Sequence, residues 1–144
     1  MIERCVDASL AVKWAVKGEP FRAKALAFLR AARTGRVRLV APPHFLSEVD
    51  SVIRKRVFYG QMTAAEARKA YVILDAAPVQ IVDVPGVRQR AREIAEQFNQ
   101  RAVYDATYAA LAELRGCEFW TADKAFFDAG KAALPFVKYL PDYP

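Results

Sequence analysis

Four carboxylates in similar settings are the residues of this 144-residue chain best placed to do chemistry. Asp7 follows a short apolar run and precedes a helical pattern, so it lies where a predicted strand ends and a helix begins. In open α/β sheets, ligand chemistry collects at that edge of the central strands. Asp123 repeats this setting after a later apolar run. The other two acids lie near the beginnings of predicted helices, and the full set is Asp7, Glu48, Asp105 and Asp123.

Each of these acids also has a purely structural explanation. Asp7 and Asp123 are good N-cap residues for the helices that follow them. Glu48 lies at the border of an amphipathic stripe, where a solvated glutamate is normal. The helix dipole stabilises an aspartate such as Asp105 in a first turn, but this helix is apolar on nearly every side and should be buried, so its Asp needs a partner. Because the same setting recurs four times, we favour a shared site over four unrelated caps.

Short apolar strands alternate with amphipathic helices along the whole chain. Strands are predicted at 2–6, 36–41, 78–84, 118–121 and 136–140, with 78–84 at an edge of the sheet. Helices are predicted at 8–16, 19–34, 45–58, 63–77, 87–98, 104–114 and 124–129. This alternation predicts one α/β domain over residues 1–144, with a parallel sheet and helices on both faces. The four carboxylates would then meet at one end of the sheet.

Four carboxylates in one place predict a bound cation. Each like-charge pair about 4 Å apart costs about 4 kcal/mol at an effective dielectric of about 20, so either the pKa values rise or a divalent cation neutralises the group. Oxygen ligands without clustered His or Cys indicate Mg²⁺ or Mn²⁺, and the single histidine, His44, is predicted to be a loop or core residue. Such a metal site can hydrolyse phosphodiester bonds.

The charge balance suggests a polyanionic partner such as nucleic acid. Lys and Arg number 22 and Asp and Glu 16, which gives a net charge of +6. Simple solubility would also explain this charge, and for any single cation a solvated surface position is the more common case. The candidate cations for contacting a nucleic acid are Lys13, Lys17, Arg54, Lys55, Arg101 and Lys124.

Several other classes of protein fit the sequence poorly. Cys5 and Cys117 do not form a CxxC pair, so we expect neither a disulfide framework nor a zinc site, and a reducing cytosol fits. No apolar run approaches the length of about 20 residues that spans a bilayer, and we expect no signal peptide. The nucleotide-binding motifs GxGxxG and GxxxxGK[ST] are absent, as is the GxSxG of acyl transfer.

The motifs around the four acids together resemble the PIN domain, and more narrowly the VapC toxin of VapBC toxin–antitoxin pairs. The resemblance spans essentially the whole chain, and the helix beginning Tyr-Asp-Ala followed by Thr-Ala-Asp is its most specific part. One departure is Ser51, where many members carry Asn three residues after the helix Glu. The motifs are Val-Asp7-Ala-Ser9, Glu48-Val, Tyr-Asp105-Ala-x-Tyr-x-Ala-Leu-Ala-Glu and Thr121-Ala-Asp123-Lys.

The resemblance implies a three-layer α/β/α fold with a central, mostly parallel sheet, and a Mg²⁺- or Mn²⁺-dependent endoribonuclease. It implies that the four acids form the catalytic and metal site, with Ser9 or Thr121 supporting it by hydrogen bonds. It also implies a homodimer in the cytoplasm, a VapB-type antitoxin, and contact with DNA only through that antitoxin. An apolar dimer interface, or equally core packing, would use Phe58, Tyr59, Met62, Tyr71 and Ile73.

Two other functions remain open from the sequence. The chain could be a PIN-like module that binds RNA or a protein and has lost catalysis, although converged carboxylates are of no use to a surface that only binds a polyanion. It could also be a DNA nuclease of the same fold, because the phosphate chemistry is shared and selectivity for the 2′-OH comes from surface contacts. The RNA target and the number of metal ions are not predicted.

Overall fold

Five short strands form one parallel sheet in a computed structural model that describes all 144 residues. The sheet has the order β3-β2-β1-β4-β5, so β1 lies at its centre, and every neighbouring pair is parallel. The order confirms the parallel sheet and the edge position of the third strand. The strands are β1 (Ile2–Val6), β2 (Val37–Ala41), β3 (Val79–Ile81), β4 (Glu118–Thr121) and β5 (Val137–Tyr139).

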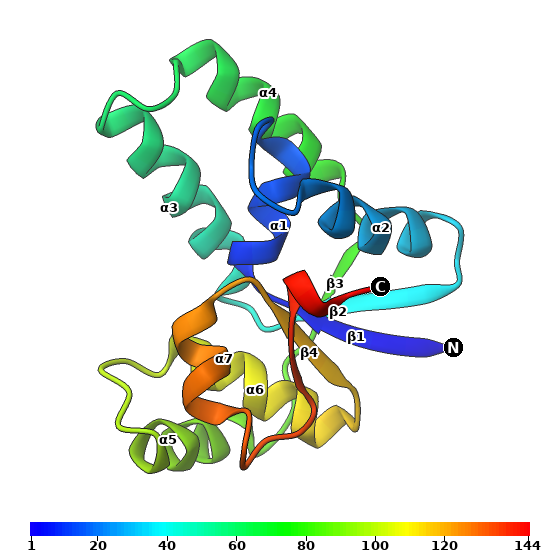
Figure 1. Cartoon of the computed structure of the whole chain (residues 1–144), viewed down its shortest axis with the longest axis vertical. Helices are drawn as coiled ribbons and strands as arrows, with labels where there is room; N and C mark the ends of the chain where they lie inside the picture. The colour runs from blue at the N-terminus through cyan, green and yellow to red at the C-terminus, as the bar shows by residue number, and fades with distance from the viewer.

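Helices cover both faces of this sheet and complete three layers (Figure 1). The first four helices lie on one side of the sheet and the last three on the other. The predicted α/β/α arrangement is therefore confirmed. No helix combines the length and the apolar character needed to cross a bilayer. The helices are α1 (Ala8–Ala15), α2 (Arg22–Arg33), α3 (Phe45–Phe58), α4 (Ala64–Ala76), α5 (Val87–Gln97), α6 (Tyr104–Arg115) and α7 (Lys124–Gly130).

The chain reverses its direction of travel across the sheet between β1 and β4. It runs from β1 outward through β2 to β3, and then crosses back to place β4 on the other side of β1. Such a switch point opens a crevice at the carboxyl ends of the two strands, where ligands bind in open α/β sheets. Val6 is paired with Trp120, which puts the next residues, Asp7 and Thr121, at the same level of that edge.

The structure differs from the prediction in the third strand and in the C-terminal tail. The third strand is only Val79–Ile81, because the ladder to β2 closes with a hydrogen bond from the Val82 N–H to the Ala41 carbonyl and the chain then turns away. The C-terminal tail contains a short 3₁₀ helix, Leu140–Asp142, after β5. The start of α4 is as predicted, since Thr63 and Glu66 form a reciprocal capping box.

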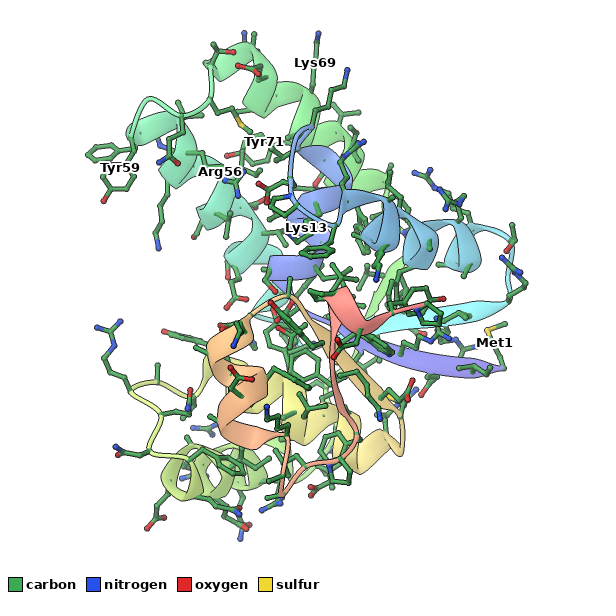
Figure 2. All side chains as sticks on the ribbon, viewed as in Figure 1. Met1, Lys13, Arg56, Tyr59, Lys69 and Tyr71 are labelled. Atoms are coloured by element: carbon green, nitrogen blue, oxygen red, sulfur yellow. The ribbon has the colours of Figure 1, made fainter.

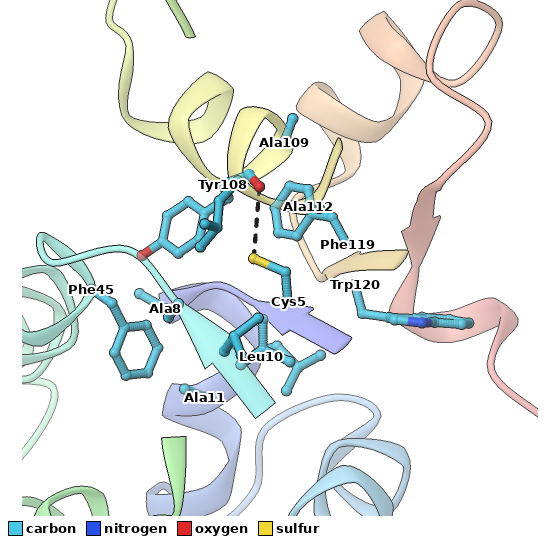
Figure 3. Packing of buried hydrophobic residues seen from close by; sticks show 14 of the residues in the cluster. Cys5, Ala8, Leu10, Ala11, Phe45, Tyr108, Ala109, Ala112, Phe119 and Trp120 are labelled. Carbon is cyan, nitrogen blue, oxygen red and sulfur yellow. Dashed lines mark hydrogen bonds between the residues drawn. The ribbon is translucent and has the colours of Figure 1, made fainter. Parts of the chain in front are cut away.

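Small residues let α6 pack closely against the central strands. Ala106, Ala109 and Ala112 are fully buried on this helix. The thiol of Cys5 on β1 donates to the backbone carbonyl of Tyr108 over 3.6 Å, and Figure 3 shows this contact among the buried side chains between α6 and the sheet. The close packing fixes the first turn of α6 over the carboxyl end of β1.

The helices α3 and α4 form an arm that extends beyond the sheet (Figures 1 and 2). A separate small core holds the arm against α1; its members are Val12, Ile53, Ala67 and Ala70. Of the predicted interface residues, Met62, Tyr71 and Ile73 pack partly against the core clusters. Phe58 and Tyr59, in contrast, are about 70% exposed, at 71% and 69%, and Figure 2 shows Tyr59 at the tip of the arm.

Candidate active site

Asp7 is buried at the carboxyl end of β1 and is held by three donors. Its Oδ1 accepts from the Leu10 N–H over 3.1 Å and from the Ser9 hydroxyl over 2.6 Å, and its Oδ2 accepts from the Thr121 hydroxyl. Asp7 therefore does cap α1, and it also has hydroxyl donors from two different turns. Asp7 can therefore cap the helix and belong to the site at the same time.

The same hydroxyls tie the turn after β1 to the turn after β4. Ser9 Oγ accepts from the Ala122 N–H, and Thr121 Oγ1 accepts from the Asp123 N–H, each over 3.0 Å. The side chain of Asp123 caps α7 through the Phe126 N–H over 3.1 Å. Ser9 and Thr121 thus fix the relative position of the two sheet-edge aspartates, which is a supporting role.

Asp105 couples electrically to each of the other three acids. Burial, together with the charges of Asp123 and Glu48, raises the pKa of Asp105 to about 6. Burial, with a smaller effect from the charge of Asp105, raises the pKa of Asp7 to about 7 in spite of its three hydrogen-bond donors. The structure therefore brings the four predicted carboxylates into one region, with Asp105 in the middle.

Glu48 is held by Tyr108 and bordered by His44, two side chains that sequence reasoning did not place in the site. The Tyr108 hydroxyl donates to Glu48 Oε1 over 3.0 Å, and His44 Nε2 lies 3.9 Å from Glu48 Oε2. Burial, with the nearby charge of Glu48, raises the pKa of Tyr108, so the phenol stays protonated as a donor. A helix position three residues after Asp105 was the available signal for Tyr108, because such residues share a face.

His44 is half-buried between Glu48 and two aromatic rings. Burial lowers the pKa of His44 below its ordinary value, against the charge of Glu48. Its Nε2 is buried without a hydrogen-bond partner. His44 is a packed residue, as predicted. Its ring also lies beside Glu48, at the edge of the four carboxylates.

No Lys or Arg side chain forms an ion pair with any of the four carboxylates. None of Asp7, Asp105 and Asp123 forms an ion pair, and the only basic group within 4.0 Å of Glu48 is His44 at 3.9 Å. The side chains as they stand do not form a finished cage, since no three of them are arranged to hold an ion. The set of carboxylate oxygens lacks a counterion, and the pKa values of Asp7 and Asp105 are raised, so the site nevertheless fits a hard divalent cation that draws the carboxylates together.

Comparison with known proteins agrees with this geometry. The family model of the PIN domain matches residues 4–132. The chain belongs to the PIN-domain family. Ribonuclease VapC9 of Mycobacterium tuberculosis is 34% identical over 94 residues, which are 65% of this chain and 72% of that protein. This PIN domain is therefore of the VapC type.

Two solved structures show how widely the fold of this PIN domain is shared. VapC20 of Mycobacterium tuberculosis, a toxin that cleaves the sarcin–ricin loop, superposes with a TM-score of 0.62 at 20% identity, covering 88% of this chain and 95% of that one. VapBC2 of Rickettsia felis, bound to a DNA fragment of its promoter, gives a TM-score of 0.64 at 12% identity, covering 96% and 98%. At these identities the likeness concerns the fold alone.

The basic residues predicted to contact nucleic acid fall into two groups. Lys13 is not free at the surface: it is 8% exposed, and its Nζ donates to the Pro20 carbonyl over 2.8 Å and lies 3.9 Å from Glu19. Figure 2 labels it near the middle of the molecule, on α1. Lys124 is exposed but paired with Asp128 over 2.6 Å. The remaining candidates are exposed to solvent, namely Lys17, Arg54, Lys55 and Arg101.

Proposed function

We propose that this VapC-type PIN domain is a Mg²⁺- or Mn²⁺-dependent endoribonuclease that hydrolyses RNA phosphodiester bonds at the four-carboxylate site. The observation that carries the proposal is a set of buried and half-buried acids, coupled through Asp105 and left without a counterion, in a chain of net charge +6. The name of the relative, a ribonuclease, supports RNA as the substrate.

A divalent cation bound at this site would neutralise the carboxylates, activate a water for attack on phosphorus and stabilise charge on the phosphate oxygens. Asp7, Asp105 and Asp123 are the residues that would hold it. Glu48 has one oxygen fixed by Tyr108, so it is oriented to accept the proton of the attacking water. Ser9 and Thr121 keep Asp7 in place through this change, because their hydroxyls are bound to both turns of the sheet edge.

Metal dependence is the first test of this function. The purified protein is incubated with total RNA, and with single-stranded DNA of matched sequence, in Mn²⁺, in Mg²⁺ and in chelator. We expect discrete RNA fragments with either metal and none with chelator. Cleavage that persists in chelator would contradict the metal site, and cleavage of DNA alone would identify a DNA nuclease of the same fold. No cleavage with any metal would favour a module that only binds.

Tyr108→Phe tests whether the hydrogen bond to Glu48 serves the reaction. The substitution removes one buried hydroxyl and keeps the ring, which stacks on Phe119 at 5.6 Å and contacts His44. Partners that orient a metal-site residue are worth about 10- to 100-fold in metal affinity or activity, so we expect a loss of that size. The measurements are the cleavage rate and the Mn²⁺ concentration for half-maximal rate, with the thermal midpoint as a check of folding. A wild-type rate and metal requirement would mean that the bond is only structural.

We further propose a VapB-type antitoxin as the natural partner, a homodimer as the assembly and the cytoplasm as the location. The solved VapBC2 pair supports the antitoxin, and DNA would then be contacted only through it. The exposed Phe58 and Tyr59 support an interface between copies. Sedimentation at micromolar concentration tests the dimer, because a single 16.1 kDa species would contradict it.

A further inference from the structure

Tyr104 is an exposed aromatic residue beside the acidic site. It is the first residue of α6, directly before Asp105, and 59% of its surface is exposed. Its ring contacts that of His44 in a tilted arrangement, with the ring centroids 5.7 Å apart and the ring planes at 41°. Single exposed aromatic residues are common on protein surfaces, so the place of this ring directly beside the acids, and not its exposure alone, is the observation that matters.

His44 holds Tyr104 next to the acids. The His44 ring is 4.7 Å from the ring of buried Tyr108, and its Nε2 faces Glu48 Oε2 at 3.9 Å. One side chain therefore separates the exposed ring of Tyr104 from Glu48. His44 is itself packed against buried Tyr108, so it restrains the side of Tyr104 that it contacts, while 59% of the Tyr104 surface stays exposed. A supported ring loses little conformational freedom when something stacks on it.

We propose that Tyr104, supported by His44, is a stacking platform for an unpaired nucleobase of the RNA beside the bond that is cut. This inference rests on the proposed ribonuclease function and adds a substrate class to it. Every base has a π-face, and aromatic side chains bind unpaired bases in this way in single-stranded RNA. Bases inside a duplex are already stacked on one another, so the platform selects single strands and loops.

The segment before α6 supplies further features of a single-strand site. Arg101 is exposed in this segment, and Val103 is 43% exposed immediately before Tyr104. A cation for the phosphate backbone beside an aromatic ring for the base is the combination found in proteins that bind single strands. The acids themselves repel phosphate, so contacts at the rim must contribute to holding the RNA there.

The chain offers a matched control for this platform. Tyr59 is a tyrosine of similar exposure, at 69%, but it pairs with Phe58 at the far end of α3 from His44. Figure 2 shows it at the tip of the arm. A helix of this length spans about 20 Å at about 1.5 Å per residue, so Tyr59 is well removed from the acids.

Fluorescence of 2-aminopurine reads base stacking directly. Short single-stranded RNAs with 2-aminopurine at successive positions are bound to the Asp7→Asn protein, which keeps them uncut. We expect quenching at one position, and we expect Tyr104→Ala in the same background to lose the quenching and to bind about 5- to 100-fold more weakly. Tyr104→Phe should retain both, because it keeps the ring, and Tyr59→Ala should behave as the parent protein. The same RNA in a duplex, where 2-aminopurine is already quenched by its neighbours, should show no further quenching when the protein is added.

Two results would overturn the platform. One is binding and quenching by Tyr104→Ala equal to those of the parent protein. The other is unchanged RNA binding by Tyr104→Ala together with weaker association with the antitoxin, which would make the ring a protein contact. Failure of the proposed function is distinguishable: it appears as no cleavage by the unmodified chain in any metal, whereas the platform is read from binding and fluorescence without cleavage.

Discussion

Asp7→Asn is expected to abolish RNA cleavage and, in the absence of metal, to make the protein more stable at pH 8. The first effect follows from losing a carboxylate that would hold the cation; a charge-stabilising group of this kind contributes about a hundred- to a thousandfold in rate. Cleavage of RNA in Mn²⁺ by equal amounts of both proteins measures it. A variant that cuts at the wild-type rate would show that Asp7 is not part of the reaction.

The gain in stability follows from the raised pKa of Asp7. Burial brings this pKa from 3.8 to about 7, so the folded state binds a proton that the unfolded state has released between these values. The contribution of Asp7 to stability is therefore complete below pH 4 and is lost as the pH rises through 7. At pH 8 the folded protein bears the cost of an ionised buried acid, which the amide avoids. We expect a gain of about 2 to 4 kcal/mol in the free energy of unfolding, since one pKa unit is about 1.4 kcal/mol.

The amide also fits the hydrogen bonds around position 7. Asn is a good N-cap, so its oxygen can accept from the Leu10 N–H, and its NH₂ group can donate to the Thr121 hydroxyl, which can rotate. Asp128→Asn is a matched control, because the pKa of Asp128 is lowered by its hydrogen bond to Lys124 and this acid is exposed on the outer face of α7. That variant should keep cleavage and gain no stability at pH 8. Equal gains in both variants would attribute the effect to net charge and not to the site.

The four acids could be predicted from the sequence because their positions depend on local rules. Asp7 and Asp123 follow apolar strands and precede helices, and parallel strands place all such turns at one edge. The same rules predicted seven helices and five strands to within a few residues at each end. The order of strands and helices along the chain therefore determines where the four acids lie.

The partners of these acids could not be predicted in the same way, because they depend on how distant elements pack. Tyr108 reaches Glu48 only because the alanines of α6 bring that helix close to β1. The burial of Lys13 could not be predicted for the same reason. A lysine on a short amphipathic helix resembles a surface cation, but the turn before α2 folds back and supplies the Pro20 carbonyl, and Arg56 of α3 pairs with Glu19 at 3.1 Å. Neither contact is visible in the spacing of residues along the chain.

Stabilisation of the protein by Mn²⁺ is expected to increase strongly between pH 5 and pH 8. A cation binds ionised carboxylates, and at pH 5 the site acids with a pKa of about 7 and about 6 are mostly protonated, Asp7 more than Asp105. If both must ionise, proton competition weakens binding by about a thousandfold at pH 5 relative to pH 8. A metal concentration about 100 times its dissociation constant at pH 8 would add about 2.7 kcal/mol there and almost nothing at pH 5.

The effect of these two acids is isolated by comparing the Mn²⁺-induced shift of the thermal midpoint in the wild type with that in Asp7→Asn at each pH. Other acids change the stability with pH independently of the metal, because the pKa of Glu3 is lowered by its hydrogen bond to Arg115 and the stability from this pair is lost as the pH falls through that lowered value. Thermal midpoints with and without Mn²⁺ are therefore measured for the wild type and for Asp7→Asn across the pH range. We expect a pH-dependent shift in the wild type and almost no shift in the variant. A wild-type shift of equal size at pH 5 and pH 8 would place the metal away from Asp7 and Asp105, because only a site without their raised pKa values binds a cation independently of the pH in this interval.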